Sequence, residues 1–270
     1  MLDRYNRKIN YLRISVTDRC NLRCHYCMPE NDPCLLRHED ILSFEEIQQV
    51  VAVAVSLGID KVRLTGGEPL VRKDIVDLVS MIAEVPGLQD LAMTTNATLL
   101  ERFAMPLARA GLQRINISLD TVDPVKFREI TRGGDIQQVF AGIRSAKKAG
   151  LEPVKVNCVI QGGPGEVDME ADALSVAGYC RENGLQVRFI PKMDLHTGQF
   201  GIVYGGTGGD CKQCNRLRLT SDGKMKPCLF SDLAFDIRSL GIQKAMEMAL
   251  EAKPEKGTVN LSNCFHNIGG

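Results

Sequence analysis

The chain has 270 residues, 44% of them hydrophobic, and its 33 lysines and arginines balance its 33 aspartates and glutamates. This length can bury a large core, either as one domain or as a barrel-sized domain with a smaller one. The balanced charge argues against a basic surface for nucleic acid or an anionic membrane. No segment resembles a signal peptide or a membrane span, so we expect a cytoplasmic protein.

Short runs rich in β-branched residues alternate with helical segments through the first 190 residues. We expect strands at 11–17, 61–65, 91–95, 114–119, 154–160 and 185–190. We expect helices at about 43–57, 74–84, 99–110, 135–149 and 169–183. Ser43 and Glu46 form a capping-box pattern at the start of the first helix, and glycines follow several helix ends. Repeats of this kind predict an α/β fold with a parallel sheet, open or curved into part of a barrel.

The pattern changes after residue 190. The segment 196–211 contains six glycines in sixteen residues, and a short helix is expected around 241–252. We therefore divide the chain into a core of residues 1–190 and a smaller appended domain of residues 191–270.

Six of the ten cysteines form two groups. The first is Cys20, Cys24 and Cys27, which follows the first strand, and the second is Cys211, Cys214 and Cys228. Because cytosolic thiols stay reduced, metal binding is the leading use for clustered cysteines. Of the isolated cysteines, Cys158 and Cys180 fit a role as small buried hydrophobic residues, whereas the roles of Cys34 and Cys264 stay open.

Each group is one ligand short of the four that a structural zinc site or an ordinary cubane iron–sulfur cluster needs. An open metal position could bind a cofactor or substrate directly. Three alternatives remain: a disulfide in the first group, a zinc site completed there by His25, and a zinc site completed in the second group by His196 or His266.

Two arginines follow Cys214 of the second cysteine group. In a strand, Arg216 and Arg218 would point to the same face and could bind phosphate bidentately. The alternative is a solvated basic strand.

The spacing C-x3-C-x2-C, with Tyr26 before the last cysteine, resembles the signature of radical S-adenosylmethionine (SAM) enzymes. The resemblance implies a [4Fe–4S] cluster on the three thiolates, with an open iron that chelates SAM, and a 5′-deoxyadenosyl radical formed on reduction. The stretch Gly66-Gly67-Glu68-Pro69 matches the superfamily's GGEP motif, and Ser118 matches a ribose-contacting position.

The full set of motifs is similar to the GTP 3′,8-cyclase family, also called molybdenum cofactor biosynthesis protein A. The matching stretches include LRISVTDRCNLRCHYCMP, VRLTGGEPLVRKD, CNRLRLTSDGK and the terminal IGG, over about 11–190 and 198–270. The resemblance implies a partial (β/α)6 TIM-like barrel with a small C-terminal α+β domain that carries a second [4Fe–4S] cluster.

The resemblance also assigns roles to residues. Cys20, Cys24 and Cys27 would hold the cluster that binds SAM, and Cys211, Cys214 and Cys228 a second cluster that meets the guanine of GTP. The implied SAM contacts are Tyr26, Gly66, Gly67, Glu68, Ser118 and Met193. The implied GTP contacts are Arg13, Lys61, Arg63, Thr94, Lys155, Arg188, Arg216 and Arg218. Arg13 is also implied in catalysis, as is a tail, Gly269-Gly270, that reaches the active site.

The implied reaction converts GTP into (8S)-3′,8-cyclo-7,8-dihydro-GTP, the first step of molybdenum cofactor biosynthesis. The adenosyl radical would remove hydrogen from C3′ of the ribose, and the carbon radical would attack C8 of guanine. Implied partners are an electron donor such as flavodoxin or ferredoxin, the downstream cyclic pyranopterin monophosphate synthase and a second copy of the chain.

The sequence departs from the family near the sixth strand. Pro191 replaces a carboxylate, and several dozen residues of the family are missing between Met193 and Gly198. Two alternatives therefore stay open: a paralogue with both clusters that acts on another nucleotide or small molecule, and a non-catalytic zinc or iron–sulfur protein.

Overall fold

The computed structural model describes residues 1–28, 35–162, 170–262 and 265–268. Cys34, Cys264, Gly269 and Gly270 lie outside the described residues. The strands are β1 (Tyr11–Ser15), β2 (Lys61–Thr65), β3 (Asp90–Thr95), β4 (Arg114–Ser118), β5 (Lys155–Ile160), β6 (Gln186–Pro191), β7 (Arg216–Leu219), β8 (Lys224–Lys226) and β9 (Phe235–Asp236). The helices are α1 (Phe44–Ser56), α2 (Ile75–Ala83), α3 (Leu100–Arg109), α4 (Pro124–Thr131), α5 (Ile136–Lys148), α6 (Ala171–Glu182), α7 (Ile237–Leu240), α8 (Ile242–Glu251) and α9 (Phe265–Ile268).

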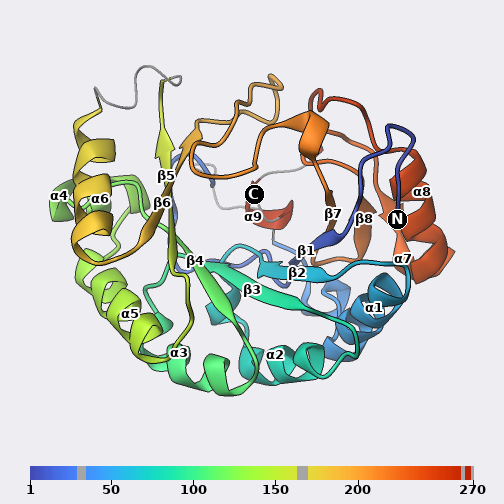
Figure 1. Cartoon of the computed structure of the whole chain (residues 1–270), viewed down its shortest axis with the longest axis horizontal. Helices are drawn as coiled ribbons and strands as arrows, with labels where there is room; N and C mark the ends of the chain where they lie inside the picture. Colours follow the sequence, from blue (N-terminus) through green and yellow to red (C-terminus); the bar gives the residue numbers. More distant parts are fainter. Residues whose placement is uncertain (29–34, 163–169, 263–264, 269–270) are drawn as a thin grey trace.

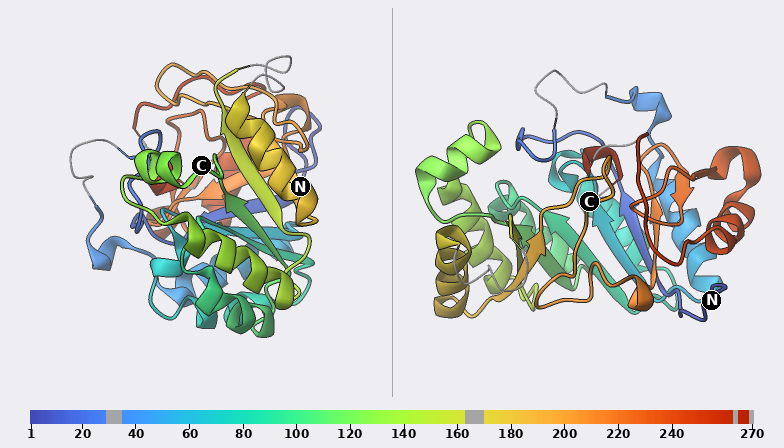
Figure 2. Two further views of the ribbon diagram at one scale, coloured as in Figure 1. Left: turned by 90° about the vertical axis from the view of Figure 1, so that its left-hand side faces the viewer. Right: turned by 90° about the horizontal axis from the view of Figure 1, so that it is seen from above.

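Strands β1 to β6 pair in parallel in chain order and curve into an open crescent (Figure 1). Helices α1 to α6 cover its convex side, and α9 lies within its concave side (Figures 1 and 2). The predicted partial barrel is confirmed, and each predicted strand and helix agrees with the structure to within two residues at either end. In the described part of the chain, no helix is long and apolar enough to cross a membrane.

The C-terminal segment continues the same sheet. Strand β7 pairs in parallel with β1 at its other edge, and β8 and β9 follow in antiparallel order. This pairing places the segment that begins at β7 beside the first strand of the chain. The boundary at residue 190 stays a prediction, because the sheet runs through both parts.

The start of α1 follows its sequence pattern, since Ser43 Oγ accepts from the Glu46 backbone N–H and Glu46 Oε2 accepts from the Ser43 N–H. Helix α4 was not among the predicted helices, although its start carries a signal: Asp123 Oδ1 accepts from the N–H groups of Val125 and Lys126, and Pro124 occupies the first helical position.

The connection after β6, where family residues are missing, is a tight packed turn. Asp194 and Gln199 form an antiparallel bridge, and Asp194 Oδ1 accepts from the His196 N–H. Leu195 is buried in a small core with Leu229, Phe230 and Ile268. The short connection therefore packs against the C-terminal segment.

Two helical glycines have opposite surroundings. A Cβ atom on Gly142 of α5 would lie 2.5 Å from the carbonyl oxygen of Ala97, so α5 can pack this closely only without a side chain there. A Cβ atom on Gly178 of α6 would have nothing within 4 Å.

We predict that Gly142→Ala lowers the free energy of unfolding by about 1–3 kcal/mol, because the methyl group forces α5 away from Ala97. Gly178→Ala is the matched control and raises the free energy of unfolding by about 0.5–1 kcal/mol, because alanine favours the helix. Urea unfolding of both variants measures the difference, and equal shifts for the two would contradict this packing.

Candidate functional site

Two neighbouring cavities lie on the concave side of the sheet. The larger is about 340 Å³ and the smaller about 190 Å³. They share Asn157, Ile190 and Met193 as lining residues, so they meet near the ends of β5 and β6.

All three cysteines of the first group line the smaller cavity. Their loop connects β1 to the region before α1, and the Leu22 N–H donates to Cys20 Sγ at 3.4 Å. The Tyr26 hydroxyl donates to Asp120 Oδ2 at 2.7 Å, and Asp120 Oδ1 accepts from the Val159 N–H at 2.8 Å. Burial, with Asp120 adding to it, raises the pKa of Tyr26 well above its usual value. This contact fixes the cysteine loop against the ends of β4 and β5.

The glycines of the GGEP stretch line the smaller cavity and also pack against the cysteine loop. The Gly67 N–H donates to the Thr17 carbonyl oxygen at 2.8 Å, and a Cβ atom on Gly67 would lie 2.3 Å from the Arg19 carbonyl oxygen. A Cβ atom on Gly66 would lie 2.6 Å from the Thr17 carbonyl oxygen. The packing of the protein chain alone therefore requires glycine at both positions, whether or not a ligand is bound.

Glu68 is 1% exposed and joins the ends of β2 and β3. Its Oε1 accepts from the Thr95 hydroxyl at 2.7 Å and from the Leu70 N–H at 3.0 Å, and its Oε2 accepts from the Asn96 N–H at 2.7 Å. Burial raises the pKa of Glu68 to about 7, although these hydrogen bonds oppose the shift. The carboxylate is engaged by the chain itself, so its role toward the cavity is to position the surrounding loops.

Ser118, Thr94 and Met193 also line the smaller cavity. The Thr94 hydroxyl is buried without a hydrogen-bond partner in the described structure. Thr94 was predicted to contact the nucleotide, and it lines the smaller cavity with the first cysteine group.

The second cysteine group lines the larger cavity, together with six of the residues predicted to bind GTP: Arg13, Lys61, Arg63, Arg188, Arg216 and Arg218. The two arginines of β7 therefore face the same space, as their alternation along a strand predicts. Lys155, also predicted to bind GTP, lines neither cavity. Burial and its neighbour Arg188 lower the pKa of Lys155 to about 8.

Three of these arginines lie at one level of the sheet. Arg13 of β1 is in register with Arg63 of β2 on one side and with Arg218 of β7 on the other. Because neighbouring strands are about 4.8 Å apart, positive charge is concentrated here. Burial and the adjacent Arg218 hold the pKa of Arg13 well below its usual value, and burial together with Arg216 lowers that of Arg218 to about 10. A bound anion would offset the cost of these charges.

Tyr11, which was not among the predicted site residues, lies close to two of these cations. The ring centroid of Tyr11 is 5.4 Å from the Arg63 guanidinium carbon and 5.8 Å from that of Arg216. The alternation Tyr11-x-Arg13 in a strand is a signal that could have placed both side chains on one face. Arg114 also lines this cavity, but it is paired with Asp90.

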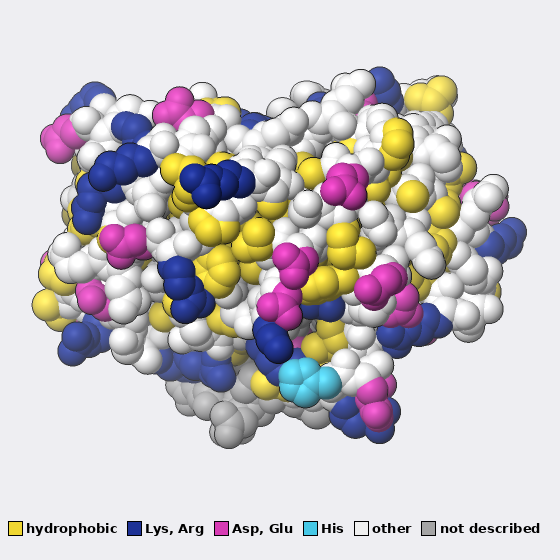
Figure 3. Space-filling model, turned by 90° about the horizontal axis from the view of Figure 1, so that it is seen from below, with side chains coloured by type: hydrophobic (Ala, Val, Ile, Leu, Met, Phe, Trp, Pro, Cys, Tyr) yellow, Lys and Arg dark blue, Asp and Glu magenta, His cyan; other side chains and the backbone are white. Residues whose placement is uncertain are grey.

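The outer helical face differs from this cavity. Figure 3 shows basic and acidic side chains interspersed there, with hydrophobic side chains between them. The row of arginines at one level of the sheet, by contrast, lines the larger cavity on the concave side.

The three cysteines at the smaller cavity are a donor set that an iron–sulfur cluster can use. Within the described ranges, no group of three histidine, cysteine or acidic side chains is placed to hold one metal ion, and no disulfide forms. His196 lies in the turn after Asp194, and His266 interacts with Cys27 of the first group. A four-iron cluster spreads its thiolates over separate irons, so three cysteines around a cavity suit it. Cys158 and Cys180 are each 1% exposed, as predicted.

Two family models match the chain. The model of the radical SAM superfamily matches residues 14–176, and that of the Molybdenum Cofactor Synthesis C family matches residues 181–258. The first covers more than half of the chain.

Curated relatives match nearly the full chain. It is 40% identical to "GTP 3′,8-cyclase" of Alkaliphilus oremlandii, over 95% of this chain and 94% of that protein. It is 43% identical to the protein of that name in Thermodesulfovibrio yellowstonii, over 89% and 88%. The match to the protein of Heliobacterium modesticaldum is 40% identical and covers 100% of both, and its alignment spans 331 positions. That span exceeds the 270 residues of this chain, which agrees with a shortened segment.

Solved structures share the fold at low identity. Streptococcus suis SuiB bound to S-adenosylmethionine has a TM-score of 0.64 and 15% identity, over 93% of this chain and 66% of that one. Native anSMEcpe with bound AdoMet has a TM-score of 0.62 and 17% identity, over 91% and 81%. These structures share the fold, and the sequence matches show that the chain belongs to the GTP 3′,8-cyclase family of the radical SAM superfamily.

Proposed function

We propose that this chain cyclises GTP to (8S)-3′,8-cyclo-7,8-dihydro-GTP in the first step of molybdenum cofactor biosynthesis. The observation that carries the proposal is the row of Arg218, Arg13 and Arg63 beside the second cysteine group, in a cavity that adjoins the first. Curated relatives named "GTP 3′,8-cyclase" support this activity.

The smaller cavity is the proposed SAM site. Cys20, Cys24 and Cys27 would hold a [4Fe–4S] cluster there. Tyr26, Gly66, Gly67, Ser118 and Met193 line the space in which SAM would lie, and Glu68 holds the surrounding loops. When bound, cluster and SAM supply a 5′-deoxyadenosyl radical that removes hydrogen from C3′ of the ribose.

The larger cavity is the proposed GTP site. A triphosphate carries several negative charges, and arginine binds phosphate bidentately without losing its own charge. Arg13, Arg63, Arg188, Arg216 and Arg218 line this cavity with Lys61. These cations would hold the triphosphate and keep the ribose at the junction of the two cavities, near Met193.

The second cluster, on Cys211, Cys214 and Cys228, is part of the same proposal. Its support is that all three side chains line the nucleotide cavity. The electron donor, the downstream synthase, the homodimer, the cytoplasmic location and the role of Gly269 and Gly270 stay predictions.

One observation favours the paralogue as a second candidate. The turn at Asp194–Gln199 replaces several dozen residues, and it begins next to Met193, which lines both cavities. A shorter wall at this junction could admit another nucleotide or small molecule.

Anaerobic reconstitution tests the function. With SAM, dithionite and GTP, mass spectrometry should detect 5′-deoxyadenosine and cyclised GTP, with about eight irons for every chain if each group holds a four-iron cluster. Cys211→Ala, Cys214→Ala and Cys228→Ala together should halve the iron content. Deoxyadenosine without a GTP product favours the paralogue, and a colourless zinc-loaded protein contradicts both.

Arg63→Met tests the phosphate site, because Arg63 Nε is buried without a hydrogen-bond partner in the described structure. We expect GTP affinity to fall roughly 10- to 150-fold, as charged hydrogen bonds are worth about 1.5–3 kcal/mol. Burial lowers the pKa of Arg63, so its loss should leave the ligand-free chain equally or more stable.

Equilibrium dialysis and thermal unfolding measure the two effects of Arg63→Met. Arg144→Met, on the exposed side of α5, is the control and should change neither. Weaker binding accompanied by lower stability would instead indicate a purely structural role for Arg63.

Lys155 gives a pH test. Its pKa of about 8 means that the charged form is lost as the pH rises above 8, whereas bound GTP favours that form. GTP affinity should therefore fall by up to about tenfold between pH 7 and pH 9. Lys155→Arg stays charged and should lose this part of the pH dependence. Parallel affinity profiles for the two proteins would show that Lys155 does not contact the nucleotide.

A further inference from the structure

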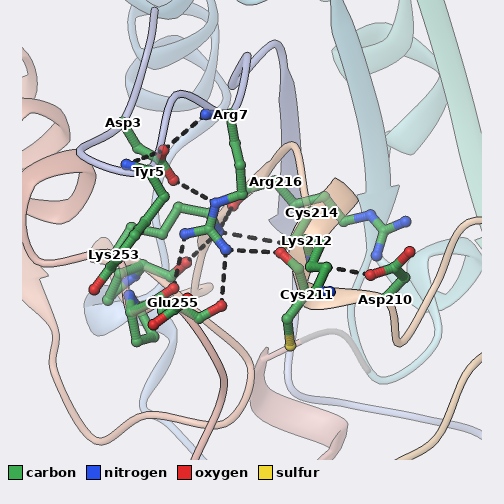
Figure 4. A network of polar contacts seen from close by, with 12 residues as sticks. Asp3, Tyr5, Arg7, Asp210, Cys211, Lys212, Cys214, Arg216, Lys253 and Glu255 are labelled. Carbon is green, nitrogen blue, oxygen red and sulfur yellow. Dashed lines mark hydrogen bonds and ion pairs between the residues drawn. The ribbon is translucent and has the colours of Figure 1, made fainter.

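Lys253, just after α8, is a buried lysine at the second cysteine group and is 1% exposed. Its Nζ donates to the carbonyl oxygen of Arg216 at 2.7 Å and lies 3.4 Å from Cys214 Sγ (Figure 4). It also donates to the carbonyl oxygen of Pro227 at 2.9 Å. The lysine thus links the start of β7, just after Cys214, to the residue between β8 and Cys228.

Lys253 and the residues after it contact the chain beside Cys214 and Cys228. Arg216 and Pro227 are close neighbours in sequence of Cys214 and Cys228, respectively, so Lys253 fixes the backbone beside both. The segment after Lys253 also approaches Cys228, because a Cβ atom on Gly257 would lie 3.4 Å from its sulfur.

Arg7 completes the brace from the N-terminus. Its Nη1 donates to the carbonyl oxygens of Cys211 at 2.7 Å and Glu255 at 3.0 Å, and its Nη2 donates to that of Pro254 at 2.7 Å (Figure 4). Asp3 Oδ2 accepts from Arg7 Nε at 2.6 Å, which fixes the guanidinium. Arg7 therefore ties Cys211 to the segment that follows Lys253.

The charge of Lys253 is not balanced by a carboxylate in the described part of the chain, where its contacts are two carbonyl oxygens and a sulfur. A buried ammonium group is costly unless it is paired with an anion. A cluster held by thiolates is the anion that this position would face.

We propose that Lys253 is a positioning residue for the second cluster and makes its reduction easier. This inference rests on the proposed function, since it requires that cluster. Reduction adds negative charge, which a fixed cation beside Cys214 stabilises, and hydrogen bonds to the sulfurs and net charge set cluster potentials. Lys253 thereby adjusts electron delivery in the nucleotide cavity.

The test uses a parent protein with Cys20→Ala, Cys24→Ala and Cys27→Ala, so that only the second group can hold a cluster. An anaerobic redox titration followed by electron paramagnetic resonance gives the midpoint potential. In this parent, Lys253→Met should make reduction at least tenfold less favourable, which is about 59 mV lower for a one-electron couple. Lys256→Met removes a charge from the same segment at an exposed position and should leave the potential unchanged.

The outcomes separate this inference from the function it rests on. A parent without iron contradicts the second cluster itself. A parent with about four irons whose potential is the same after Lys253→Met overturns the role of Lys253. If Lys253→Met loses its iron, Lys253→Arg decides: retained iron at the parent's potential supports a role for the charge, and lost iron overturns it.

Discussion

The parallel pairing of β1 with β7 is the contact on which the rest of the site depends. Strand β1 leads into the first cysteine loop, and β7 lies between Cys214 and Cys228 of the second cysteine group. Because the two strands are neighbours in one sheet, two cysteine groups about 190 residues apart in sequence border adjoining cavities. The same pairing sets Arg218 level with Arg13, which is the middle residue of the cationic row.

The cationic row is a cost that the fold carries for binding. Arg13, Arg63 and Arg218 lie on adjacent strands, and burial lowers the pKa of each. Leucines at these positions would make a more stable sheet, as Leu12 does on the opposite face of β1, where it is fully buried. A polyanion that enters the cavity would replace repulsion by charge-assisted hydrogen bonds. The buried positive charge of this row therefore favours a phosphate-bearing ligand over a neutral one.

The fold could be predicted from local sequence patterns, whereas contacts between distant segments could not be predicted. The capping box at Ser43 and the alternation in β1 to β6 depend on neighbouring residues, and the structure has both. The sequence predicted that Gly67 lies at the site. It could not show that the Cα of Gly67 lies against the Arg19 carbonyl group. The burial of Lys253 was not predicted, since its three partners are Cys214 before β7, Arg216 in β7 and Pro227 after β8. A lysine after a helix gives no sign of burial.

The shortened connection after β6 changes one wall of the site and leaves the rest in place. Leu195 of the turn packs with Leu229 and Phe230, in the segment that follows Cys228, so the turn is anchored to the part of the chain that carries the second cysteine group. None of the arginines in the cationic row belongs to this turn, and Met193 still lines both cavities. The loss of family residues therefore affects the junction between the cavities, where a ribose would lie, more than it affects the phosphate cluster. Selection among nucleotides would be decided at that junction.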